Sequence, residues 1–149
     1  MKMMRIGRYI YYIIGVILLT ACGEFEPSGN GHLDGFWQLS TVDTLQTGRS
    51  ADLRADGLTW SFQDALLELR DTRKVHQDII MDFQHTGGQL RLSAPYLVDR
   101  DAGDIVIEDL GLLRPYGIQA REEVFSVVEL TSGKMVLESG LLRLHFRKY

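Results

Sequence analysis

Apolar and polar residues alternate in short runs over most of the chain. In the run at residues 58–63, Leu58, Trp60 and Phe62 occupy one side of an extended backbone, and the residues between them are polar. A period of two is typical of a β-strand with one face buried and the other in solvent. The same kind of pattern recurs in six further runs, at residues 35–43, 79–84, 89–94, 124–130, 134–139 and 141–146.

Turn sequences separate these runs. The sequence HTGG at residues 85–88 lies between two of them and predicts a β-hairpin, and Ser-Gly pairs at 132–133 and 139–140 separate the last three runs. We count seven to nine strands in a meander with short connections. The pattern therefore predicts an all-β fold, a small antiparallel up-and-down β-barrel, because closure removes the exposed edges of such a sheet.

Residues 64–74 fit two structures. The segment contains good helix formers and begins at Asp64, a residue suited to an N-cap, so propensity favours a helix. Apolar residues at 65, 67 and 69 nevertheless alternate with charged ones, as in a strand. We favour the strand, because a turn at Gln63-Asp64 would pair this segment with the run before it.

The stretch 96–120 is the least regular part of the chain, and we expect a long loop that wraps the barrel. Its acidic sequence DRDAGDIVIED suggests calcium, because hard cations prefer several carboxylate oxygens from one compact loop. Asp99 and Asp101 fit the first positions of an EF-hand loop, but Gly103 and Asp104 depart from it. A solvated acidic loop is the better interpretation, and we expect no metal site.

The only cysteine of the chain, Cys22, follows a short apolar segment. Lys2, Arg5 and Arg8 precede an uncharged run at residues 9–19, which is the arrangement of a secretory signal peptide. The apolar run is shorter than the roughly 20 residues that span a bilayer, so a permanent helical anchor is the weaker alternative. With a single cysteine, a disulfide within the chain is impossible.

The sequence LTAC at residues 19–22 resembles the lipobox of bacterial lipoproteins. This resemblance implies cleavage before Cys22 and acyl chains on its thiol, and two or more chains give stable membrane anchoring. We therefore expect a signal peptide at 1–21, a flexible tether at 22–32 and a folded domain at 33–149. Gly23 differs from the aspartate that holds some lipoproteins at the inner membrane, so we expect the outer membrane.

The charge of the chain argues against nucleic acid as a partner. The full sequence has 16 lysines and arginines against 20 acidic residues, a net charge of −4. Loss of residues 1–21 leaves 13 basic residues against 20 acidic ones, a net charge of −7. Nucleic-acid phosphates require a basic surface, and the same acidity disfavours electrostatic adhesion to membranes.

The sequence GFW at residues 35–37 opens the first strand and is similar to the Gly-x-Trp signature of lipocalins. Residues 33–149 as a whole resemble the lipocalin-like lipoproteins of Bacteroidetes. The resemblance implies that Gly35 and Trp37 belong to the closure of one barrel end. It also implies that a basic residue of the last strand, Arg147 or Arg143, lies across the tryptophan ring as a cation–π partner.

Large apolar side chains on the inward-facing positions are candidates for a binding cavity. An eight-stranded barrel is just wide enough either to be filled by side chains or to hold one small ligand, and for any one of these residues core packing is the favoured interpretation. We expect a membrane-anchored protein that binds a small apolar molecule or lipid; the other hypothesis is a filled barrel that docks an envelope or host protein. The candidate ligand-binding residues are Trp60, Phe62, Met81, Phe83 and Phe125.

No arrangement of residues indicates catalysis. The sequence contains no Gly-x-Ser-x-Gly elbow, and its four histidines lie on separate segments without metal-ligand spacing. We expect these histidines at the surface or at strand ends, and we expect neither enzyme activity nor a cofactor. The histidines are His32, His76, His85 and His145.

Replacement of the cysteine tests the anchor. We expect Cys22→Ser to leave an uncleaved precursor without acyl chains, because the serine hydroxyl is not the thiol that the lipid-transfer reaction requires. Metabolic labelling with palmitate, followed by fractionation of the envelope, measures both effects. Continued palmitate incorporation in Cys22→Ser would contradict the lipobox assignment.

Overall fold

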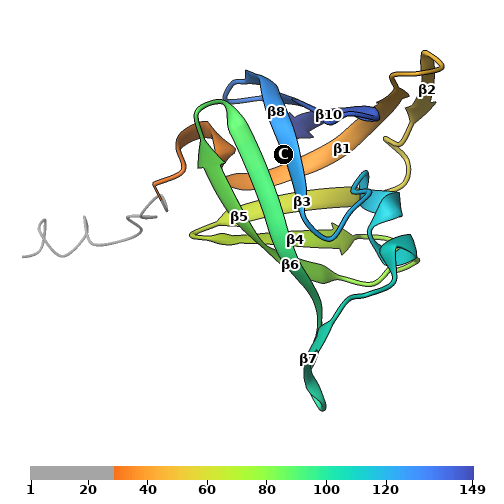
Figure 1. Cartoon of the computed structure of the whole chain (residues 1–149), viewed down its shortest axis with the longest axis vertical. Helices are drawn as coiled ribbons and strands as arrows, with labels where there is room; N and C mark the ends of the chain where they lie inside the picture. The colour runs from red at the N-terminus through yellow and green to blue at the C-terminus, as the bar shows by residue number, and fades with distance from the viewer. Residues whose placement is uncertain (1–28) are drawn as a thin grey trace, which may run out of the picture.

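Eight of the ten strands form a closed antiparallel barrel in the computed structural model, which describes residues 29–149 (Figure 1). The predicted signal peptide, the lipobox and most of the predicted tether lie outside the described residues. The strands are β1 (Gly35–Thr44), β2 (Arg49–Asp52), β3 (Leu58–Gln63), β4 (Leu66–Asp71), β5 (Ile79–Thr86), β6 (Gln89–Asp99), β7 (Gly103–Val106), β8 (Glu123–Leu130), β9 (Lys134–Glu138) and β10 (Leu142–Lys148). Three 3₁₀ helices accompany them, η1 (Gly31–Leu33), η2 (Leu110–Leu112) and η3 (Arg114–Tyr116).

The barrel closes where the last strand pairs with the first. Strand β10 runs antiparallel to β1 from the pair Trp37 and Lys148 to the pair Thr44 and Leu142, with a register shift after Leu39. The remaining order is β1, β3, β4, β5, β6, β8, β9 and β10, so the barrel strands follow the order of the sequence. The predicted all-β, antiparallel, up-and-down barrel is confirmed.

Two short strands stand outside the barrel. Strand β2 pairs with the second half of β1, and β7 pairs with the end of β6. Every residue of both strands is exposed, so neither has the apolar alternation by which the sequence identified the others. This is why the total exceeds the predicted seven to nine strands although the barrel itself has eight.

The ambiguous segment at residues 64–74 contains strand β4, as favoured. Asp64 adopts a positive φ of 54° in the turn that follows β3, and β4 then pairs with β3 along its whole length. Leu67 and Leu69 are fully buried, which is the face that the alternation predicted.

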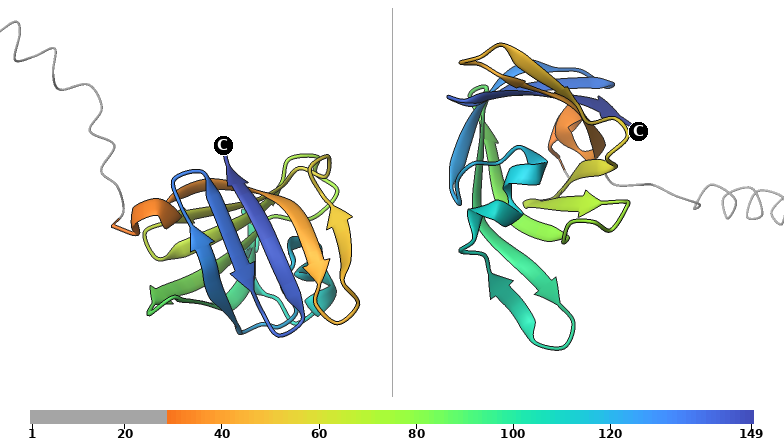
Figure 2. Two further views of the ribbon diagram at one scale, coloured as in Figure 1. Left: turned by 90° about the horizontal axis from the view of Figure 1, so that it is seen from above. Right: turned by 90° about the vertical axis from the view of Figure 1, so that its right-hand side faces the viewer.

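The expectation of one long loop over residues 96–120 is wrong in part. Strand β6 continues to Asp99, and β7 returns beside it to form a hairpin that projects from the barrel. The chain then crosses one end of the barrel through η2 and η3 (Figure 2). Within this crossing Ile107, Leu113, Tyr116 and Ile118 are buried. This stretch shows no period-two alternation because its apolar side chains close one end of the barrel and do not lie along the inner face of a strand.

The opposite end is closed around Trp37. Its indole is fully buried and donates a hydrogen bond from Nε1 to the Leu33 carbonyl oxygen in η1, at 2.9 Å. Gly35 adopts a φ of 108°, and a Cβ there would lie 3.1 Å from Cε of Lys148. Thus η1, which begins inside the predicted tether, belongs to the folded unit.

The cation over this tryptophan is Lys148, which corrects the expectation of Arg143 or Arg147. The Nζ atom of Lys148 lies 5.0 Å from the centroid of the Trp37 ring, because β10 places the two residues opposite each other. Arg147 instead donates from Nε to Oε1 of Gln38 at 2.6 Å, and Arg143 forms an ion pair with Glu138. Both arginines occupy outward-facing positions of the alternating strand.

Aromatic side chains fill the interior. The ring of Trp60 lies 4.9 Å from that of Phe146, 6.0 Å from that of Phe125 and 6.2 Å from that of Phe62, measured between centroids. Phe62 in turn meets Phe83 edge to face at 5.0 Å. Edge contacts of this kind add stability to the burial of the ring area itself.

All five predicted ligand-binding side chains belong to this core. None of Trp60, Phe62, Met81, Phe83 and Phe125 is exposed by more than 6%.

Among residues 29–149, no helix has the length and apolar character needed to cross a bilayer.

Truncation of one interior ring tests whether the core is packed. We expect Phe62→Ala to lower the free energy of unfolding by about 3–5 kcal/mol, because it removes apolar contacts and leaves a cavity. The matched control is Phe36→Ala on the neighbouring strand, where the ring is 58% exposed. That surface change should stay within about 0.5 kcal/mol. Urea unfolding measures both, and equal small losses would contradict a packed interior.

Candidate functional site at the mouth of the barrel

The end of the barrel beside η2 and η3, which we call the mouth, carries two hollows. They lie on either side of the β4–β5 connection at residues 72–78, the mouth loop, and His76 borders both. The first has a volume of about 220 Å³ and is lined by Leu53, Asp56, Leu58, Asp71, Arg73, Val75, His76 and Pro115. The second, of about 320 Å³, is lined by Lys74, His76, Gln77, Asp78, Leu97 and Val98.

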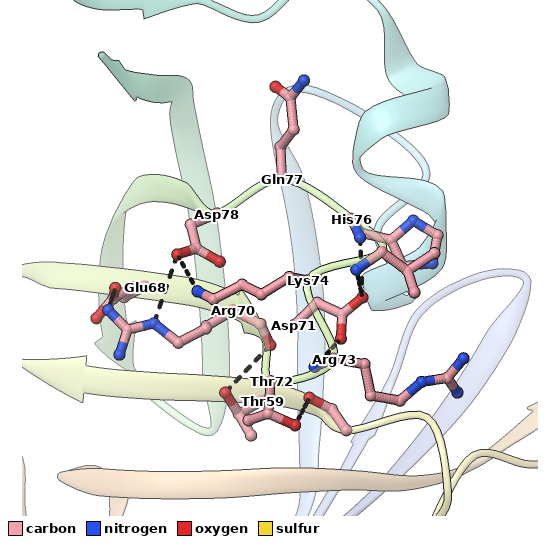
Figure 3. A network of polar contacts seen from close by, with 12 residues as sticks. Thr59, Glu68, Arg70, Asp71, Thr72, Arg73, Lys74, His76, Gln77 and Asp78 are labelled. Carbon is pink, nitrogen blue, oxygen red and sulfur yellow. Dashed lines mark hydrogen bonds and ion pairs between the residues drawn. The ribbon is translucent and has the colours of Figure 1, made fainter. Parts of the chain in front are cut away.

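Asp71 holds the mouth loop in its bent course (Figure 3). One carboxylate oxygen accepts the backbone N–H of Arg73 at 2.8 Å, and the other accepts those of Val75 at 3.0 Å and His76 at 2.8 Å. The loop also contains Lys74 at a φ of 59°, a conformation in which a lysine is uncommon. Three backbone N–H groups that donate to one carboxylate therefore fix the conformation of a loop that has no regular secondary structure.

The same contacts determine the charge of Asp71. Only 1% of the residue is exposed, and burial by itself raises the pKa of a carboxyl group. The three backbone N–H groups act in the other direction, and the net result is a pKa below the ordinary value. Asp71 is thus ionised at neutral pH.

Asp78 and two cations form a second polar cluster on the loop. Oδ2 of Asp78 lies 3.3 Å from Nζ of Lys74 and 3.6 Å from Nε of Arg70, which also pairs with Glu68. Oδ1 of Asp78 is buried and accepts no hydrogen bond from the described residues. The cations are roughly half exposed or more, so these ion pairs are weak and can exchange partners.

Tyr116 in η3 links the mouth to the core. Its hydroxyl donates to the carbonyl oxygen of Gln77 at 2.9 Å, and its own carbonyl accepts Nε1–H of Trp60 at 3.2 Å. Burial, together with Asp78 and Asp71, raises the pKa of the hydroxyl far above its ordinary value, so it remains a donor at every physiological pH. The plug and the mouth loop therefore support each other.

None of the predicted interior residues lines these hollows. Sequence reasoning assigned the ligand to the core and missed Asp71 and Tyr116, whereas its expectation of His76 at the surface is confirmed. One signal for Asp71 was available: the residue follows Leu67 and Leu69 on the inward-facing side of β4, where a charge is unusual. Nothing local marks Tyr116, whose partners lie 39 and 56 residues away.

A serine, an aspartate and a histidine also meet on the outer face of β1, β2 and β10. Oδ2 of Asp43 contacts Nε2 of His145 at 2.7 Å, and the other oxygen accepts the hydroxyl of Ser50. In a catalytic triad the histidine lies between the serine and the acid, whereas here the acid lies between the other two. This order activates no nucleophile.

The described residues also contain no group of three or more histidine, cysteine or acidic side chains placed to hold a metal ion. The acidic stretch that follows Asp99 lies on the exposed hairpin and the chain after it, and Asp99 itself caps the N–H groups of Asp101 and Ala102.

The pH dependence of stability tests the role of Asp71. Since its folded-state pKa is lowered, its ionised form stabilises the fold above the ordinary pKa, and this contribution is lost as pH falls through the folded-state value. We expect Asp71→Asn to cost about 1–3 kcal/mol at pH 7, with a smaller difference in acid. The control Asp104→Asn, at an exposed aspartate, should change little. Urea unfolding at several pH values between neutral and acid measures the difference in the free energy of unfolding between the wild type and Asp71→Asn. A difference that stays the same at every pH would contradict the assignment.

Comparison with known proteins supports the architecture. A family model for a lipocalin-like domain matches residues 17–149. A lipocalin-like protein from Bacteroides uniformis has the same fold, with a TM-score of 0.62 and 19% sequence identity over 80% of this chain and 100% of that protein. An uncharacterized protein from Bacteroides eggerthii gives a TM-score of 0.55 and 18% identity over 78% of this chain and 99% of its own.

No protein of curated function matches the sequence significantly. The family model covers most of the chain, including the Gly-x-Trp motif and every strand of the barrel. The chain therefore belongs to the family of lipocalin-like domains.

Proposed function

We propose that this protein is a non-enzymatic binding protein of the cell envelope, anchored by acyl chains on Cys22, that takes a small amphipathic molecule at the mouth of its barrel. The observation that carries the proposal is the contrast between a filled interior and a hollowed mouth. Trp60 and the rings around it occupy the space in which an enclosed ligand would lie. We therefore assign the ligand to the mouth and not to the five core residues.

The walls of the mouth suit a molecule with an apolar body and an anionic group. Apolar side chains form half of the lining of the first hollow, and the mouth loop contributes Arg73, Lys74 and His76 to the two hollows. The carboxylates in the lining are those of Asp56, Asp71 and Asp78. Arg73 pairs with Asp56 at 3.0 Å and Lys74 with Asp78 at 3.3 Å, and both cationic side chains are more than half exposed. A bound anion can compete for such cations, because exposed ion pairs contribute little.

The size of the hollows limits the ligand. Volumes of about 220 and 320 Å³ stand at or below the lower end of the range for drug-sized pockets, roughly 300–1,000 Å³. Each hollow opens to the surface, so a ligand can enter without displacing the plug at η3. The expected ligand is therefore small, with part of its surface left in solvent.

The position of the N-terminal segment is compatible with an anchored protein. Asn30 donates from Nδ2 to the carbonyl oxygen of Asp64 in the β3–β4 turn, so the chain enters the barrel at its closed end. The mouth, beside η2 and η3, lies at the other end (Figures 1 and 2). An anchor at Cys22 would then leave the mouth facing away from the membrane and open to solutes.

A charge introduced beside the hollow tests the site. We expect Val75→Asp to weaken binding of anilinonaphthalene sulfonate, an apolar ring system with one anionic group, by about tenfold, because it places a carboxylate against the sulfonate. Val75 is 63% exposed, so the fold should tolerate the change. Fluorescence titration measures the affinity.

The matched control is Val128→Asp on β8, where the valine is 56% exposed and borders neither hollow. It should leave the affinity unchanged. Equal affinities for the wild type and both variants, or equal losses in both variants, would contradict a ligand site at the mouth.

A further inference from the structure

The β6–β7 hairpin extends beyond the wall of the barrel (Figures 1 and 2). Strand β6 pairs with β5 along one side, whereas on its other side the first four residues pair with β8 and the last four with β7. Among the described residues β7 pairs with no other strand. One edge of β7 is therefore open over its whole length.

The hydrogen-bond phase of the hairpin identifies the open amides. Ile107 donates its N–H to the Pro95 carbonyl oxygen at 3.0 Å, in line with the register that pairs Leu97 with Ile105. Hydrogen-bonded and non-hydrogen-bonded pairs alternate along an antiparallel ladder. It follows that the N–H and C=O groups of Asp104 and Val106 point away from β6, towards the open edge.

Apolar side chains surround this edge on both faces of the hairpin. Val98 is 56% exposed, Ile105 45% and Val106 61%. Single exposed apolar residues are ordinary, but natural edge strands usually avoid several together, because such an edge recruits another strand. The other strand with a single partner, β2, has no large apolar side chain.

The charge around the edge is acidic. Asp99, Asp101, Asp104, Glu108 and Asp109 lie in or next to β7, against the single basic residue Arg100. Asp99 also holds the hairpin tip by accepting the N–H groups of Asp101 and Ala102 at 2.8 and 3.1 Å. A second copy of the chain would bring these carboxylates together, whereas a basic strand would neutralise them.

We propose that β7 docks an extended, basic segment of another protein, which pairs with its open edge as an added strand. Main-chain hydrogen bonds to Asp104 and Val106 supply the pairing, and side chains of alternate residues decide the partner. Lysine or arginine on the added strand lies on the face of Asp104, and β-branched residues at the alternate positions contact Ile105 on the opposite face. This function goes beyond ligand binding at the mouth and does not rest on it.

The test uses the full-length protein in detergent and a synthetic peptide in which lysine and valine alternate over about ten residues. We expect the peptide to bind and to slow hydrogen exchange of the Asp104 and Val106 amides, measured by NMR. Val106→Pro removes one outward N–H without touching a bond to β6, and should weaken binding about tenfold. The matched control is Ser50→Pro, which alters the exposed strand β2 and should leave binding unchanged.

A second variant tests the charge without altering the backbone. Asp104→Lys should abolish the preference for the lysine peptide over a companion in which glutamate replaces lysine. Unchanged exchange at Asp104 and Val106 under saturating peptide, or equal binding by wild type and Val106→Pro, would overturn the proposal. Protection of these amides that rises with protein concentration without peptide would overturn it in favour of a second copy. Because Asp104 and Val106 border neither mouth hollow, failure here leaves the ligand site untouched.

Discussion

The pairing of β10 with β1 is the constraint on which the rest of the structure depends. It joins the two ends of a sheet made in sequence order and encloses one interior volume. In a barrel of eight strands this volume is only wide enough for side chains or for one small ligand. Here Trp60 and the phenyl rings around it fill the volume, so closure produces a rigid core rather than an enclosed binding cavity.

Because the interior of the barrel is filled, the candidate binding surfaces lie at its ends and edges. At the closed end Trp37, η1 and Lys148 seal the interior and receive the N-terminal segment. At the mouth a hydrogen-bonded path runs from Trp60 through Tyr116 to Gln77, so the position of the mouth loop is coupled to the packing of the core. A buried aspartate with three backbone donors completes that loop.

Closure also explains the two additional strands. Once β1 has β10 and β3 as neighbours, and β6 has β5 and β8, the barrel has no further place for a strand. Strands β2 and β7 can only pair with the free ends of β1 and β6, and each then presents an open edge. The two edges differ in their side chains: β2 is polar, whereas β7 combines exposed aliphatic groups with carboxylates. Membership of the lipocalin-like family accounts for the barrel.

The sequence by itself predicted the fold class, a count of seven to nine strands and the inward-facing residues of the clearest runs, because a half-buried strand imposes a period of two that each run carries locally. It left residues 64–74 open between a strand and a helix. The resemblance to lipocalins implied a cation over Trp37 but pointed to Arg143 or Arg147 instead of Lys148, because the choice depends on the register between two strands more than 100 residues apart. Only the tertiary structure decided that Trp60, Phe62, Met81, Phe83 and Phe125 fill the interior. The alternation of apolar and polar residues predicts which side chains face inwards, whereas the volume left between them depends on how they pack together. The mouth likewise arises only when the loop that Asp71 holds, with His76 on it, meets Tyr116 of η3, whose hydrogen-bond partner Gln77 lies 39 residues away in the chain.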